Sequence, residues 1–232
     1  MNNYTISIII ILVLLIVAGG VTAAIVLSDN SDNKTGSSVR GIFTNQYYGI
    51  TENSVYDTAI KVASERWSTY IRDDVNIRVN YTTFDDSSSL ILASASMTDR
   101  NDIRSGGTIR INIGRDTKPA GWDHIIEHEI GHVLGLPGSN KWTNATIVSG
   151  EDYFLDAVEF PLTAQAYYDL KGVSGNIPLA PNGGYHWNET AFTTELMTPI
   201  IEDEQELITS ILTLTAMQEI GWDVDLTQAE DF

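Results

Sequence analysis

Two histidines and a glutamate lie close together in the middle of the chain, in the run His128-Glu129-Ile130-Gly131-His132. Histidines four positions apart share one face of an α-helix, so their imidazoles can bind the same metal ion. This spacing suits two ligand positions of a tetrahedral zinc, and the glutamate beside the first histidine can reach a water on that ion. We therefore predict that His128 and His132 bind zinc and that Glu129 is catalytic.

The third ligand is absent from its usual place. The long form of this motif, H-E-x-x-H-x-x-G-x-x-H, requires a histidine where this chain has Gly138. The motif's own glycine is present as Gly135, which suits a left-handed turn at the end of the helix. His186 is our candidate, because a Met-Thr-Pro turn with Met197 follows it after a short interval. We expect Met197 to form an apolar floor beneath the ligands without binding metal.

A second interpretation of the histidines competes with the first. His124, Glu127 and His128 match the inverted motif H-x-x-E-H. One helix cannot offer His124, His128 and His132 to a single ion, because the outer two are about 12 Å apart along its axis. Gly135 stands where the long motif requires it, which favours the first interpretation, with His128 and His132 as ligands.

The pattern of apolar residues predicts an α+β chain around this helix. Strands are expected at residues 39–50, 75–84, 90–95 and 108–113, and helices at 53–71, about 120–135, 161–170 and 205–220. We expect an upper lobe at residues 40–136 and a lower, loop-rich lobe at residues 137–232.

Composition limits the partners and the ligands. The net charge is −18, from 31 acidic and 13 basic residues, and this argues against nucleic acid, whose phosphates select basic surfaces. It also argues against adhesion to an anionic membrane surface. The chain has no cysteine, which excludes a disulfide, a thiolate zinc site and a cysteine-based latency switch.

The chain resembles the leishmanolysin-like metzincin zinc metalloendopeptidases, and especially their compact prokaryotic relatives. The resemblance rests on HEIGHVLG at residues 128–135, a long insertion, GGYHWNETAFTTELMTP at 183–199 and ITSILTLTAMQEIGWDV at 208–224. It covers residues 120–224 well, whereas residues 40–119 fit the family only in the order of their elements.

This resemblance implies a fold, a cofactor and an activity. The fold is the zincin-like metzincin fold, with an upper mixed-sheet lobe containing two helices and a loop-rich lower lobe ending in a helix. One catalytic Zn²⁺ is bound by His128, His132 and His186, and Met197 is the Met-turn residue. The activity is hydrolysis of peptide bonds in protein or peptide substrates, through a zinc-bound water activated by Glu129.

Two other functions are left open by the sequence. One is a catalytically inactive zinc-binding interaction module with a metzincin fold. The intact Glu129 argues against it, because holding zinc does not require that carboxylate. The other is a structural zinc domain, which requires four protein ligands, and neither a cysteine nor a fourth suitable histidine is available.

The N-terminal segment is strongly apolar. Residues 4–27 carry no charge, and as a helix they can cross the roughly 30 Å hydrocarbon layer of a bilayer. We expect residues 1–28 to be a transmembrane anchor or a signal segment, followed by a polar linker at residues 29–39. The catalytic domain at residues 40–232 is then held outside the cell membrane, or secreted if the segment is cleaved, and this segment is its only contact with membrane.

The two interpretations of the histidines differ in what they predict for single substitutions. With His186 as the third ligand, His186→Ala abolishes zinc binding, whereas His124→Ala keeps one zinc per chain. Metal analysis of the two purified variants beside the wild type measures this. The opposite result supports the inverted motif. Zinc retained in both variants would indicate that the third ligand is one of the acidic residues that follow the helix: Glu151, Asp152 and Asp156.

Overall fold

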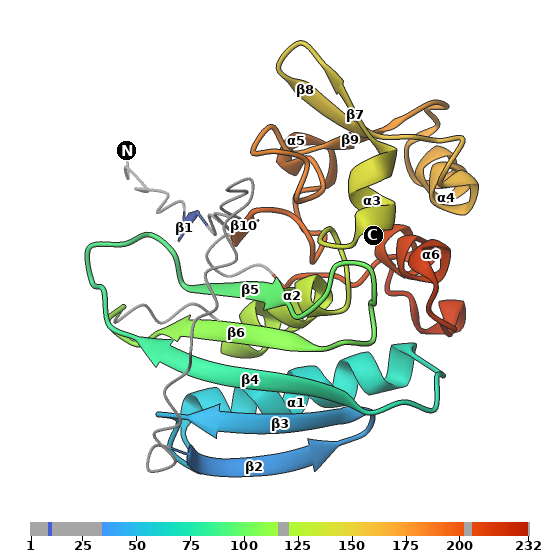
Figure 1. Cartoon of the computed structure of the whole chain (residues 1–232). Helices are drawn as coiled ribbons and strands as arrows, with labels where there is room; N and C mark the ends of the chain where they lie inside the picture. Colours follow the sequence, from blue (N-terminus) through green and yellow to red (C-terminus); the bar gives the residue numbers. More distant parts are fainter. Residues whose placement is uncertain (1–8, 11–33, 116–120, 202–205, 232) are drawn as a thin grey trace.

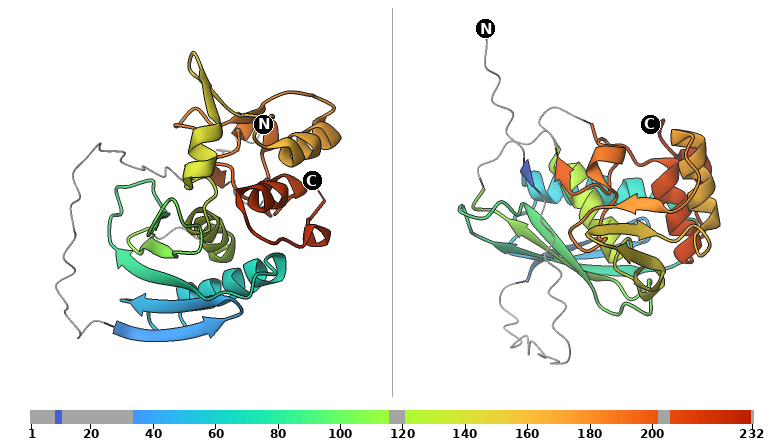
Figure 2. Two further views of the ribbon diagram at one scale, coloured as in Figure 1. Left: turned by 45° about the vertical axis from the view of Figure 1, so that its right-hand side comes forward. Right: turned by 90° about the horizontal axis from the view of Figure 1, so that it is seen from above.

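The computed structural model describes residues 9–10, 34–115, 121–201 and 206–231 (Figure 1). Helices and strands are interleaved along the chain, and the strands form sheets of five, three and two strands. The α+β class and the mixed sheet predicted from the sequence are confirmed. The larger sheet with two helices makes up the N-terminal part, and the smaller sheet lies in the C-terminal part (Figures 1 and 2).

The five-stranded sheet mixes parallel and antiparallel neighbours. Its order is β2-β3-β4-β6-β5, with β3, β4 and β6 parallel and both edge strands antiparallel to their neighbours. Strand β2 lies partly within the predicted linker, because pairing with β3 satisfies the backbone of a segment with little strand propensity of its own. The strands are β2 (Lys34–Arg40), β3 (Phe43–Tyr48), β4 (Ile77–Phe84), β5 (Ala93–Met97) and β6 (Gly107–Asn112).

One face of this sheet is buried. Along β4, Ile77, Val79 and Tyr81 are fully buried, whereas Arg78 is exposed. This alternation is typical of a strand with one covered face. The covered face is therefore the floor on which the helices of the N-terminal part pack.

Two helices cover that face of the sheet (Figures 1 and 2). Helix α1 (Val55–Tyr70) begins after Ser54, whose side chain accepts a hydrogen bond from the backbone of the first turn. Helix α2 (Trp122–Val133) follows the sheet and carries the His-Glu motif. Both helices agree with those predicted at residues 53–71 and about 120–135.

A buried carboxylate holds α2 in place. Glu127 is 2% exposed, and its side chain accepts hydrogen bonds from Arg66 at 2.8 Å and from Thr209 at 3.0 Å. The indole of Trp67 donates to the Glu127 backbone carbonyl at 2.8 Å. Since Arg66 and Trp67 belong to α1 and Thr209 precedes the last helix, these contacts tie α2 to both parts of the molecule.

The C-terminal part contains a small sheet that the sequence pattern did not predict. Its order is β7-β8-β9, and the three strands pair antiparallel. Strands of three or four residues are too short to show a periodic pattern, so this region was expected to consist mainly of loops. The strands are β7 (Thr146–Ser149), β8 (Asp152–Leu155) and β9 (Ile177–Leu179).

Among the described residues, four helices follow α2 in the C-terminal part of the chain (Figure 1). The last one, α6, begins later than the predicted residue 205, because Ser210 caps its first turn with its side chain. The helices are α3 (Asn140–Ala145), α4 (Pro161–Lys171), α5 (Glu189–Phe192) and α6 (Ile211–Ile220), and a 3₁₀ turn follows at Leu226–Gln228.

The predicted membrane anchor is wrong. Within the described ranges, no helix is long and apolar enough to cross a membrane. Ile9 and Ile10 form strand β1, which pairs antiparallel with β10 (Ile200–Ile201), whereas a spanning helix would have to run unbroken through about 20 residues. The predicted location at the cell membrane is withdrawn with it. The rest of the 4–27 segment lies outside the described residues.

The Arg66–Glu127 contact predicts a large effect on stability. Arg66→Ala leaves the Glu127 carboxylate buried without its cation, and we expect the free energy of unfolding to fall by about 3 kcal/mol. Arg72→Ala is the control, because the Arg72 side chain is 55% exposed in its ion pair with Asp225, and such pairs contribute about 0–1 kcal/mol. Urea unfolding with a chelator present measures both. Equal, small losses in the two variants would contradict this role of Glu127.

Candidate metal centre

Three histidines from distant parts of the chain meet in the interior. Helix α2 places His128 and His132 on one face, with their Nε2 atoms 3.0 Å apart. His186 comes from the loop between β9 and α5, and its ring centroid lies 5.1 Å from that of each of the other two. The ligand atoms of the three all lie within 4.8 Å of one another, and all three residues are buried.

This group fits a bound metal ion. Nitrogens about 2.0–2.1 Å from a tetrahedral zinc lie about 3.3 Å from each other, close to the separation seen for His128 and His132. His186 Nε2 is buried and has no hydrogen-bond partner in the described part of the chain. Burial lowers the pKa of His128 to about 4, and lowers the pKa values of His132 and His186 well below 6.5. All three are therefore neutral near pH 7, as metal ligands must be.

Two of the rings are oriented by backbone carbonyls. His128 Nδ1 lies 2.7 Å from the oxygen of Leu196, and His132 Nδ1 lies 2.7 Å from the oxygen of Leu136. A carbonyl only accepts, so each Nδ1 carries the proton and each Nε2 presents its lone pair to the centre.

The turn after α2 supplies one of these carbonyls. Gly135 has φ +107°, a value that L side chains rarely adopt. The chain reverses there, and the Leu136 amide bonds back to the Gly131 carbonyl at 3.0 Å, so the Leu136 oxygen comes under His132. The predicted helix stop at Gly135 is confirmed, but only the structure shows that it orients His132.

Met197 lies beneath the histidines. It is 2% exposed and lines a small hollow with His186. A Cβ atom on Gly131 would lie 2.7 Å from Met197 Sδ, so any larger residue there would require the methionine side chain to shift. The sequence motif leaves position 131 unspecified, and the close approach of Met197 to it is visible only in the packing.

Glu195 holds the Met197 turn from below. Its carboxylate is fully buried and accepts hydrogen bonds from Met197 N at 2.7 Å and from Ser210 Oγ at 2.9 Å. Burial raises the pKa of Glu195 to about 7. Since Leu196 and its His128-orienting carbonyl stand between Glu195 and Met197, this carboxylate links the metal centre to the start of α6. Sequence reasoning had not singled it out.

Glu129 is buried without a partner. It is fully buried, and neither carboxylate oxygen has a hydrogen bond within the described residues. Burial raises the pKa of Glu129 to about 8. A buried polar group of this kind lowers stability, and such groups are common at functional sites, so Glu129 beside three convergent histidines is a candidate for a functional residue.

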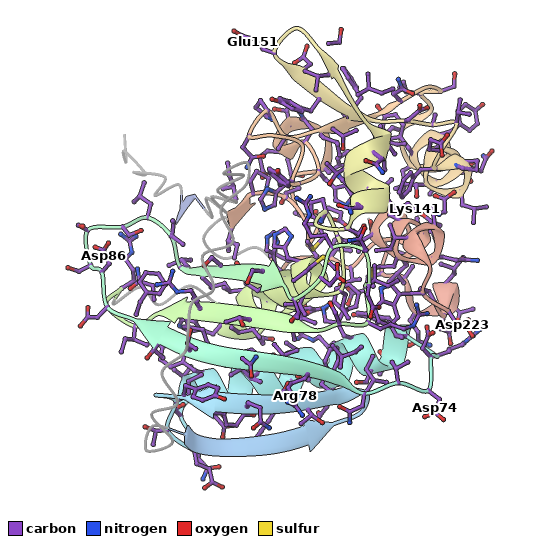
Figure 3. All side chains as sticks on the ribbon, viewed as in Figure 1. Asp74, Arg78, Asp86, Lys141, Glu151 and Asp223 are labelled. Carbon is purple, nitrogen blue, oxygen red and sulfur yellow. The ribbon has the colours of Figure 1, made fainter. Side chains whose placement is uncertain are left out.

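The competing candidates lie elsewhere. His124 is half-buried, with Nδ1 3.4 Å from Arg66 Nη1 and 3.7 Å from Glu127 Oε2, so it belongs to the cluster that anchors α2. Glu151 stands at the tip of the β7–β8 hairpin, away from the core (Figure 3). Neither residue is part of the group of metal-ligating side chains.

A pocket of about 190 Å³ lies beside the loop that carries His186. Its lining includes Trp142, Tyr153 and Tyr185. The Trp142 indole donates to the Gly184 carbonyl at 3.1 Å, which fixes this loop against α3.

Comparisons with models of protein families, with curated proteins and with solved structures found no match. The functional assignment therefore rests on the geometry of the site and on the sequence pattern.

The raised pKa of Glu195 predicts a pH-dependent stability. An acid with a folded pKa of about 7 and an ordinary value of 4.5 stabilises the fold fully below pH 4.5, and loses this contribution as pH rises to about 7. The loss amounts to about 3 kcal/mol. Glu195→Gln has no such titration, so its stability relative to wild type should rise by that amount over this range. Urea unfolding at a series of pH values, with a chelator present, measures the difference; a constant difference would contradict the assignment.

Proposed function

We propose that this protein is a zinc-dependent metalloendopeptidase. The observation that carries the proposal is the convergence of His128, His132 and His186, buried and neutral, next to a buried Glu129 without a partner. The donor set supports zinc in particular, because three imidazoles with no thiolate are typical of catalytic zinc sites that keep one position open.

The chemistry then divides between the ion and the protein. A zinc ion held by these three neutral imidazoles would act as a Lewis acid that polarises a peptide carbonyl and lowers the pKa of a bound water. The three histidines place that ion and carry no charge of their own.

Glu129 is the residue that moves the proton. The pKa of Glu129 is about 8, and a nearby cation lowers it. This brings the pKa close to 7, near the working pH, where a general base is most effective. The carboxylate takes a proton from the attacking water as the water oxygen bonds to the peptide carbonyl carbon. It returns this proton to the peptide nitrogen as the C–N bond breaks, so that one water is consumed for each peptide bond hydrolysed.

An edge strand favours an extended peptide as the substrate. Strand β5 stands at one edge of the described sheet and packs against α2. Met97 at its end lies beside Gly138, 3.1 Å from the position of a Cβ on that glycine. Edge strands bind extended peptides through backbone hydrogen bonds, so a substrate lying along β5 would pass close to the helix that carries Glu129.

The resemblance to leishmanolysin-like metzincins agrees with this proposal. Two helices on one face of a mixed sheet, a glycine turn after the motif helix and a methionine beneath three histidines are the features that the resemblance implies. We propose a metzincin fold on these grounds.

An inactive zinc-binding module is the second candidate, and Glu129 argues against it. A buried carboxyl without a hydrogen bond lowers stability, and a module that only held zinc would gain nothing from it. A structural zinc domain needs four protein ligands, and the described residues bring three together.

Substitution of Glu129 separates an enzyme from a binding module. Glu129→Gln should lower the rate of peptide hydrolysis by about 10²–10⁴-fold, because it removes the proton acceptor and keeps the shape. Zinc content should stay at one per chain. Glu52→Gln, an exposed position, is the control and should keep full activity. Hydrolysis by the Glu129 variant at the wild-type rate would exclude the proposed mechanism.

A further inference from the structure

The third histidine differs from the other two in its second nitrogen. His128 and His132 each direct Nδ1 at a backbone carbonyl. His186 Nδ1 instead lies 3.2 Å from the side-chain amide nitrogen of Asn182. The amide oxygen of Asn182 is buried and has no hydrogen-bond partner within the described residues.

A metal on His186 makes this pairing unfavourable. When Nε2 binds the ion, the remaining proton of a neutral imidazole is on Nδ1, which then donates. The amide nitrogen of Asn182 is also a donor, so two donors would face each other. Rotation of the amide by half a turn exchanges its oxygen and nitrogen, which are nearly the same in shape.

We infer that Asn182 is the positioning residue for His186, with its Oδ1 accepting the Nδ1 proton when the metal is bound. The inference rests on the proposed metal site. All three ligands then have the same arrangement, an oxygen acceptor on Nδ1 and a lone pair on Nε2 directed at the centre. Among these three acceptors, Asn182 is the one that belongs to a side chain.

The loop around Asn182 is built to hold it there. The Ala180 amide donates to the His186 carbonyl at 2.9 Å, and the Gly184 amide donates to the Ala180 carbonyl at 3.1 Å. Gly183 and Gly184 have φ +99° and +74°, which permit the tight reversal. These contacts close the segment from residue 180 to 186 on itself, so Asn182 faces the ring from a short, internally bonded loop.

Three substitutions test the inference through zinc affinity. Asn182→Asp keeps the shape and offers an acceptor in either orientation, so it should bind zinc about 10-fold more tightly. Asn182→Leu keeps the approximate size without an acceptor, and should bind roughly 10–100-fold more weakly. Asn188→Asp is the matched control: it adds the same charge nearby, and Asn188 caps α5, a position where aspartate serves equally well. Its affinity should stay close to that of wild type.

Competition with a chromophoric chelator gives the dissociation constants, and urea unfolding of the chelator-treated variants shows whether each one folds. Wild-type affinity in Asn182→Leu would overturn the inference. Equal tightening in Asn182→Asp and Asn188→Asp would also overturn it, because added charge alone would explain the result. If Asn182→Leu does not fold, the comparison of the two aspartate variants decides. Wild-type protein that binds no zinc would overturn the proposed function itself, and is recognised before any variant is measured.

Discussion

The structure depends on the burial of the second half of the motif helix. Every residue of α2 from Ile125 to Val133 is buried, so the helix must find a partner on each side. The sheet and α1 cover its apolar residues, and the Met197 turn covers the side at Gly131. The remaining side of the helix carries His128 and His132, which face His186 and can bind a metal ion together with it. Because a helix enclosed in this way cannot tilt or shift without opening cavities, the histidines are held rigidly.

Three buried glutamates in this region, Glu127, Glu129 and Glu195, differ in how the unfavourable burial of their charge is compensated. Burial penalises the charged form of each. Glu127 is compensated by Arg66 and Glu195 by hydrogen bonds, and both hold elements together. Glu129 has no such compensation in the described part of the chain. Uncompensated burial of this kind is typical of sites where chemistry is done, and it supports the role proposed for Glu129.

Sequence patterns failed where local signals are weak or are overridden by tertiary contacts. The strands β7, β8 and β9 contain three or four residues each and are stabilised by pairing with one another, which no local pattern records. The apolar N-terminal segment has the hydropathy of a membrane helix, yet Ile9 and Ile10 pair as a strand with β10. Hydropathy describes the solvent that a segment prefers and does not specify whether its backbone forms a helix or a strand.

The local geometry of the centre follows from short-range features of the chain. The spacing of His128 and His132 places them on one helix face, and Gly135 ends that helix, because the period of a helix and the conformation of glycine are properties of the chain alone. The tertiary structure decided what completes the site. The sequence names His186 as a candidate, but it lies 54 residues beyond His132, and only the fold brings it to the other two histidines. The carbonyl of Leu196 and the amide of Asn182 likewise reach the rings only after the chain has folded back. Separation along the chain does not specify distance in space, so the orienting contacts could not be read from the sequence.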